Sequence, residues 1–133
     1  MKNQEFETKW LSAFAPGLTR KQKEEAYIGR PGGFLWHAFS YELIPCLKEG
    51  EARAEYDKVK KKGAVEFFYD PSCKIGLTGE PKELSDAHTS AKQIDDLRLI
   101  EFYVIGKDYS WCYIRTHETD CGLCGPYFYW AKK

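Results

Sequence analysis

The chain has 133 residues, of which 43% are hydrophobic and 30% are charged, and this composition is ordinary for a single globular domain spanning residues 1–133. Its 20 lysines and arginines balance its 20 aspartates and glutamates, so the sequence lacks the net positive charge typical of nucleic-acid-binding proteins. The N-terminus has no apolar signal-peptide core, and no later segment approaches the roughly 18 apolar residues of a membrane span. We therefore expect a cytoplasmic protein that binds neither nucleic acid nor membranes.

The cysteines and aromatic residues add two expectations. Aromatic residues make up 16% of the chain, which predicts a core built largely of packed rings. The 5 cysteines are Cys46, Cys73, Cys112, Cys121 and Cys124. An odd number at irregular spacing argues against a disulfide framework and for reduced thiols.

The N-terminal part of the sequence predicts two helices. Apolar residues recur at helical spacing from residue 3 to residue 14, with charged residues between them, which is typical of an amphipathic helix. Thr19 and Gln22 have the spacing of a capping box, so we expect a second, mostly exposed helix that ends near Tyr27.

A strand and a third helix are predicted next. The stretch from Phe34 to Tyr41 (FLWHAFSY) is aromatic on both of its alternating sets of residues, so we predict a central strand covered on both faces. Residues 49–62 begin with acidic side chains and end with lysines, as suits the two ends of a helix dipole. Gly63 follows as a left-handed stop, and the whole pattern predicts a helix.

The remaining residues predict mainly strands. We expect them over residues 64–69, 75–78, 99–105, 111–116 and 127–130. The tripeptide Gly106-Lys107-Asp108 separates the third of these from the fourth and predicts a hairpin. Residues 79–96 are rich in glycine, proline, serine and aspartate, so we expect a loop there, with Asp95 and Asp96 as a solvent-exposed pair rather than a general acid and base.

These elements indicate an α+β fold, because helices precede a mainly antiparallel sheet. We expect the N-terminal helices to pack on that sheet as a single layer of helices. The aromatic strand over residues 127–130 (YFYW) would invite pairing if it lay uncovered at an edge, so we expect a monomer or a homodimer.

The segment from His117 to Cys124 places one imidazole and two thiols, those of Cys121 and Cys124, close together in sequence. A Cys-x-x-Cys pair is a redox site when the N-terminus of a following helix stabilises a thiolate, but here a strand is predicted to follow. A zinc ion is a second interpretation, because these groups suit tetrahedral coordination. The interpretation that we favour is a turn before the last strand, in which the thiols act as small hydrophobic groups and His117 makes ordinary hydrogen bonds.

A zinc site would need a fourth ligand from elsewhere in the chain. The candidates are His37, Cys46, Cys73 and Cys112. Cys112 lies on the opposite pleat from His117 in a regular strand, which favours His37 or Cys46. His37 also has an ordinary interpretation, as a core histidine hydrogen-bonded to a buried carbonyl or a tyrosine hydroxyl.

Enzyme motifs are absent from the sequence. It contains no phosphate-binding glycine loop, no Gly-x-Ser-x-Gly, no His-Glu-x-x-His and no kinase motifs. A catalytic mechanism would rest on His37 and His117 alone, and no spacing pairs either with a carboxylate. We therefore assign no catalytic residues and favour a protein that is not an enzyme.

Four stretches of the sequence form a pattern when taken together: Phe34–Glu42, Pro45–Ala52, Trp111–Glu118 and Cys124–Phe128. In this order they resemble a bacterial family described as domain of unknown function 4275. The family pattern maps residue by residue onto Trp36, His37, Cys46, Thr116, His117, Glu118, Cys124, Gly125, Pro126, Tyr127 and Phe128. The resemblance brings no established activity, and Cys121 is additional to the pattern.

The resemblance moves the candidate metal site away from the Cys-x-x-Cys pair. It implies a site formed in space by His37, Cys46, His117 and Cys124, with zinc as the metal. It also implies an interaction or structural role for Trp36, Glu118, Tyr127 and Phe128.

Together these observations predict a small non-enzymatic binding module. We expect it to recognise a protein partner through surface aromatic residues and residues 79–96, without a cofactor. Some small domains of this kind are immunity-like or inhibitor-like proteins, which provides an analogy for the partner. The alternative is a zinc protein whose His/Cys site is structural or has an open catalytic position.

Overall fold

A computed structural model describes residues 3–28, 35–68, 82–83, 90–97, 102–116, 119 and 125–132. The helices in these ranges are α1 (Asn3–Phe14), α2 (Arg20–Glu25), α3 (His37–Ser40), α4 (Glu49–Lys58) and α5 (Ala91–Leu97). The strands are β1 (Leu47–Lys48), β2 (Val65–Phe68), β3 (Lys82–Glu83), β4 (Phe102–Ile105), β5 (Trp111–Arg115) and β6 (Tyr127–Trp130). A short 3-10 turn, η1 (Lys107–Tyr109), joins β4 to β5. No helix in the described ranges combines the length and the apolar character needed to cross a membrane.

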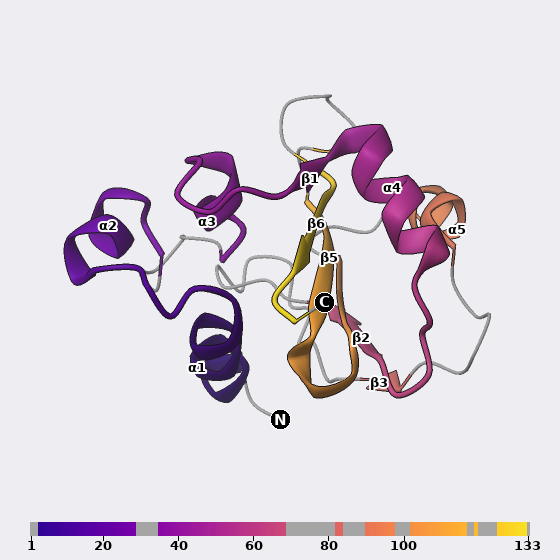
Figure 1. Cartoon of the computed structure of the whole chain (residues 1–133), viewed down its shortest axis with the longest axis horizontal. Helices are drawn as coiled ribbons and strands as arrows, with labels where there is room; N and C mark the ends of the chain where they lie inside the picture. Colours follow the sequence, from indigo (N-terminus) through magenta and orange to yellow (C-terminus); the bar gives the residue numbers. More distant parts are fainter. Residues whose placement is uncertain are drawn as a thin grey trace.

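The strands form one sheet in the order β1-β6-β5-β4-β2-β3, and all neighbours are antiparallel (Figure 1). At its centre, Cys112 of β5 lies opposite Ile105 of β4 and Tyr129 of β6. The predicted α+β class with a mainly antiparallel sheet is confirmed. The predicted hairpin at Gly106 is confirmed as well, with η1 as its turn.

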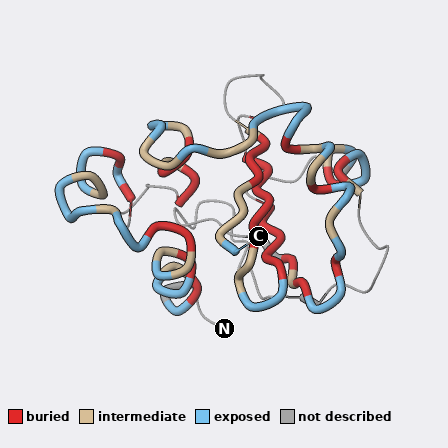
Figure 2. Tube along the Cα trace, viewed as in Figure 1, coloured by how far each residue is buried: buried red, intermediate tan, exposed pale blue. Residues whose placement is uncertain are grey.

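Helices cover both faces of this sheet. On β4, Tyr103 and Ile105 point to one face and Phe102 and Val104 to the other, and all four side chains are buried. The first pair packs with α1, α3 and the end of α2, and the second pair packs with α4 and α5. Figure 2 shows the buried strands between two groups of helices with exposed outer turns. The expectation of a single layer of helices is therefore wrong, and the domain has two. Apolar side chains project from both faces of the sheet, so helices must bury both faces.

The stretch from residue 34 to residue 41, predicted as a central strand, contains helix α3 instead, and Phe34 itself lies outside the described residues. The backbone N–H of Phe39 donates to the carbonyl of Trp36 at 2.9 Å, as in a helical turn. Both side chains are buried against the sheet. The prediction was wrong because a short run with large apolar residues on both alternating sets has the same pattern in a buried helix as in a buried strand.

The third predicted helix is confirmed as α4, but it ends at Lys58 rather than at residue 62. Lys61 folds back on the helix, where its Nζ donates to the carbonyl of Tyr56 at 2.9 Å and lies 4.3 Å from the centroid of the Tyr56 ring. This lysine therefore caps the helix from beyond its end. Gly63 has the predicted left-handed backbone, with φ of +79°, but it lies in the turn before β2.

The predicted loop over residues 79–96 contains most of α5. Ser90 and Gln93 form a capping box at its start, with the N–H of Ser90 bound to Oε1 of Gln93 at 2.7 Å and the N–H of Gln93 bound to Oγ of Ser90 at 3.1 Å. Asp57 of α4 accepts the N–H of Ala91 at 2.9 Å, which ties the two helices together. The Ser-x-x-Gln spacing is a helix signal that the prediction overlooked.

The last predicted strand is confirmed as β6, but it is not the edge of the sheet. β1 pairs with its first half, opposite Tyr127 and Phe128. Edge pairing, on which the expected homodimer depends, is therefore restricted to Tyr129 and Trp130. The strand predicted over residues 75–78 lies outside the described residues.

Gly106 leaves no room for a side chain. A Cβ placed there would lie 2.3 Å from Nε1 of Trp111, whose ring stacks on Phe128 with centroids 5.5 Å apart. We expect Gly106→Ala to lower the free energy of unfolding by about 1–3 kcal/mol, because the buried indole must shift. Gly50→Ala is the control, since nothing lies within 4 Å of a Cβ at that position. It should leave stability unchanged or slightly higher, and equal urea midpoints for the two variants would contradict the prediction.

Candidate functional site

The structure describes two of the four predicted metal ligands. His37 begins α3 and Cys46 precedes β1, whereas His117 and Cys124 lie outside the described residues. Within the described ranges, no group of three or more histidine, cysteine, aspartate or glutamate side chains is placed to hold a metal ion. The four-ligand site therefore stays a prediction.

His37 links α3 to the end of α2. Its Nδ1 lies 2.6 Å from the carbonyl oxygen of Ala26 and must be the donor, because a carbonyl only accepts. Its half-buried ring contacts the rings of Trp36 and Tyr41, with centroids 4.7 and 5.2 Å away. This geometry is that of a core histidine bound to a buried carbonyl. Because Nδ1 carries the proton, Nε2 of the neutral ring carries the lone pair.

The described cysteines, Cys46 and Cys112, are both free. Burial raises the pKa of Cys46 to about 11, and nearby Lys48 lowers it to a smaller extent. Burial likewise raises the pKa of Cys112 well above its usual range. Both thiols are therefore protonated at neutral pH, so neither is an activated nucleophile.

The other family positions in the described residues belong to the core. Trp36 is 2% exposed and stacks on Tyr127 with ring centroids 6.4 Å apart, on the face of the sheet covered by α1 and α3. Phe128 is fully buried on the opposite face, where it packs with α4 and α5. Glu118 lies outside the described residues. The structure thus brings Trp36, His37 and Tyr127 together and separates Phe128 from them by the sheet.

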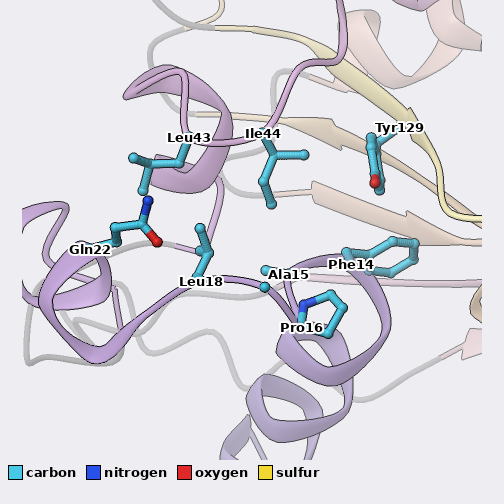
Figure 3. A pocket seen from close by; sticks show the side chains of 9 residues that line it. Phe14, Ala15, Pro16, Leu18, Gln22, Leu43, Ile44 and Tyr129 are labelled. Carbon is cyan, nitrogen blue, oxygen red and sulfur yellow. The ribbon is translucent and has the colours of Figure 1, made fainter.

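An uncharged pocket of about 340 Å³ lies between α1, α2, the segment after α3, and β6 (Figure 3). It is lined by Phe14, Ala15, Pro16, Gly17, Leu18, Gln22, Leu43, Ile44 and Tyr129. None of these residues carries a charge. Sequence analysis missed this site, because its residues come from four separate segments and no motif connects them. We name it the α1–α2 pocket.

A smaller pocket of about 280 Å³ lies beside it and is lined by Glu42, Ile44, Pro45, Cys46 and Lys48. Ile44 is common to both pockets. Lys48 and Glu42 form an exposed ion pair at 3.5 Å, so this second pocket is charged where the first is not.

Two tyrosines stand out on the surface of the same helical layer. Tyr27 is 54% exposed and Tyr41 is 48% exposed, and they are the large hydrophobic side chains that the described residues leave exposed. Tyr27 directly follows Ala26, whose carbonyl binds His37, and the His37 ring in turn contacts Tyr41. A continuous set of contacts therefore connects the two tyrosines. We name Tyr27 and Tyr41 the tyrosine face.

Tyr27 has a left-handed backbone, with φ of 60°, at a position that glycine usually occupies. The N–H of Ile28 donates to the carbonyl of Lys23 at 2.8 Å and that of Tyr27 to Glu24 at 3.2 Å, which is a Schellman motif ending α2. Glu42 holds the same position after α3, with φ of 57°. Left-handed backbone costs a non-glycine residue roughly 1 kcal/mol, so both helix ends are strained.

A charged cluster lies in the other helical layer. Asp95 of α5 accepts hydrogen bonds from Nε of Arg53 at 2.9 Å and from Nε of Arg115 at 3.0 Å. The side chain of Arg115 is only 2% exposed. Asp95 is therefore not the solvent-exposed residue that was predicted, whereas Asp96 is exposed and pairs with Lys92. The cluster joins α4, α5 and β5 in one ion network.

Two stacked tyrosines lie beside this cluster. The rings of Tyr56 and Tyr113 are 4.2 Å apart and nearly parallel. Burial raises the pKa of both hydroxyls far above their usual range, and the charges of Glu66 near Tyr56 and Asp95 near Tyr113 raise them further. Neither tyrosine can ionise at neutral pH, so the pair offers no general base.

The fold and its sites define an α+β domain with helices on both faces of an antiparallel sheet and an uncharged pocket in one helical layer. The family model described as "Domain of unknown function (DUF4275)" matches residues 3–128. The chain belongs to this family. No curated protein and no solved structure matches the chain.

We expect the ion network to be essential for stability. Asp95→Ala should lower the free energy of unfolding by about 2–3 kcal/mol, because it removes the carboxylate that accepts hydrogen bonds from the buried Arg115 and from Arg53. The neighbouring change Asp96→Ala is the control, and it should have no measurable effect because the ion pair with Lys92 is exposed. Thermal and urea unfolding of both variants test this. Equal losses would show that Asp95 does not hold the layer together.

Proposed function

We propose that the protein is a non-enzymatic binding module that recognises a protein partner through the tyrosine face. The observation that carries this proposal is the conformation of Tyr27, which is 54% exposed and yet has φ of 60°. Glycine would relieve the strain at this position, whereas the tyrosine presents a large side chain mostly to solvent. A large aromatic side chain held in this exposed position favours a role in recognition.

The chemistry of the tyrosine face suits a protein partner. Tyrosine presents a large, rigid contact area with a polar tip, and it is enriched among the residues that dominate interface energies. The hydrogen bond from His37 to Ala26 fixes the end of α2 against α3, so the backbone that carries both tyrosines is held in place. A backbone that is already ordered loses less conformational entropy when a partner binds.

The proposal has three further parts. The free thiols of Cys46 and Cys112 suit a reducing compartment, so we place the interaction in the cytoplasm. An immunity-like or inhibitor-like role is kept as an analogy for the partner. A contribution from residues 79–96 also stays a prediction, because only residues 82–83 and 90–96 of this range are described.

We expect Tyr27→Gly to separate stability from binding. It should raise the free energy of unfolding by about 0.5–1 kcal/mol, because glycine relieves the left-handed strain. It should also abolish capture of the partner by a photo-crosslinking residue, p-benzoylphenylalanine, placed at Tyr41 in cells of the source organism. Capture is measured as a discrete higher-mass product that is identified by mass spectrometry.

The matched control is Glu42→Gly, which relieves the same kind of strain after α3 and leaves Tyr27 and the crosslinking residue at position 41 in place. It should gain similar stability and retain the crosslinked product. The same crosslinker at exposed Lys62 should capture nothing. Full capture in Tyr27→Gly, or the same product from position 62, would refute recognition through the tyrosine face.

We propose a zinc site as the second candidate function, with His37, Cys46, His117 and Cys124 as ligands in a structural or open catalytic site. One observation favours it. Zinc-binding histidines commonly donate their other ring N–H to a backbone carbonyl, as Nδ1 of His37 does to Ala26. The raised pKa of Cys46, about 11, means that a metal would have to displace a thiol proton.

We expect tag-free protein, purified without chelator, to contain about one zinc per chain if this second candidate is correct. His117→Ala and Cys124→Ser should each lose the metal, because three remaining ligands hold zinc poorly. His88→Ala should retain it, since His88 is not among the proposed ligands. Elemental analysis measures the zinc content. A metal-free wild-type chain that is folded would exclude the site.

A further inference from the structure

The α1–α2 pocket is uncharged throughout. All nine residues that line it are apolar or neutral. A charged group entering the pocket would lose its hydration and find no ion-pair partner, which is unfavourable. The occupant that matches this lining is therefore uncharged.

The walls of the pocket suit an aromatic ring. Phe14 and Tyr129 approach each other edge to face, with centroids 6.2 Å apart and planes at 77°, and Pro16 lies next to Phe14 in Figure 3. Aromatic rings favour such offset and edge-to-face neighbours. The volume of about 340 Å³ also exceeds the roughly 150 Å³ that holds a benzene ring in a protein cavity, so a ring and part of its backbone fit.

The apolar rim of the pocket is incompletely buried in the free chain. Leu18, Leu43 and Ile44 are each only half-buried, and Tyr129 is half-buried beside them. An entering ring would remove the remaining apolar surface of these side chains from water, which favours binding. The rim surrounds an opening rather than a closed cavity, as an anchor residue requires.

Gln22 adds one directional group. Its Oε1 accepts the N–H of Thr19 at 2.8 Å in the capping box of α2, which fixes the orientation of the side-chain amide. Figure 3 shows the amide at the margin of the pocket next to Leu43. None of the described hydrogen bonds uses Nε2, so this N–H group can donate to a carbonyl of an incoming peptide.

From these contacts we infer that the α1–α2 pocket receives an uncharged aromatic side chain of the protein partner, whose neighbouring backbone carbonyl accepts a hydrogen bond from Nε2 of Gln22. The inference rests on the proposed function and names the anchor that the partner supplies. Tyr27 closely follows α2, which contributes Gln22 to the pocket, and Tyr41 lies just before Leu43 in the segment after α3, so one partner surface can engage both.

The test uses three defined probes: N-acetyl-phenylalaninamide, N-acetyl-leucinamide and N-acetyl-lysinamide. Each is titrated to millimolar concentration into the ¹⁵N-labelled full chain and followed by two-dimensional NMR. The phenylalanine probe should shift the backbone signals of Leu18, Leu43 and Tyr129 in a saturable way. The leucine probe should bind more weakly, and the lysine probe should cause no localised shift.

Gln22→Glu tests the polar contact without endangering the fold, because a glutamate carboxylate also serves in a capping box. It removes the Nε2 donor and places a charge at the margin of the pocket. Affinity for the phenylalanine probe should fall about fivefold or more, the effect of one ordinary hydrogen bond, while the melting temperature does not fall. Glu25→Gln on the same helix is the control and should bind like the wild type.

The results distinguish this inference from the proposed function. No localised shift with the phenylalanine probe, shifts away from the pocket, or tighter binding of the leucine or lysine probe would each overturn the aromatic anchor. Unchanged affinity in Gln22→Glu would overturn the carbonyl contact. Crosslinking from position 41 tests the tyrosine face independently. A captured partner, together with no probe-induced shift at the pocket, would therefore leave the proposed function intact.

Discussion

The fold depends on one constraint, which is that its central strands are apolar on both pleats. Tyr103 and Phe102 are neighbours in β4 and point to opposite faces, and both are buried. An antiparallel sheet can leave one face in water only if that face is polar. Here neither is, so helices must cover each side, and the sheet forms the middle layer of the domain.

The two helical layers are held in different ways. On one side, Asp95 ties α4, α5 and β5 together through two arginines, one of them almost fully buried. Such a network is rigid, because a buried charge that loses its partner is strongly unfavourable. On the other side, α2 and α3 are short, and each is followed by a strained residue. The pocket is lined by α2 and by the segment after α3. The ion network and the proposed recognition surface therefore lie in different helical layers.

Sequence patterns that act over a few residues, such as apolar spacing and capping boxes, predicted much of the fold. Most of the elements that were predicted wrongly lack such a pattern. The apolar spacing marked both ends of α1, and the capping box at Thr19 marked the start of α2. The same capping-box spacing, from Ser90 to Gln93, indicates the start of α5, where a loop was predicted from composition alone. The segment around Phe39 was predicted wrongly as a strand, because a short run with apolar residues on both alternating sets has no period by which a helix differs from a strand. The lining of the α1–α2 pocket has no local signal at all.

The sequence by itself determined the α+β class, the mainly antiparallel sheet and the boundaries of α1 and β6, because hydrophobic period, caps and turn residues act within a few positions. Membership of the family could also be recognised from the order of its motifs. Only the tertiary structure decided that β6 lies inside the sheet, that Asp95 is paired while Asp96 is exposed, and that Gln22 and Tyr129 border one pocket. These features depend on contacts between segments far apart in the chain, and a linear pattern does not encode which distant surfaces meet.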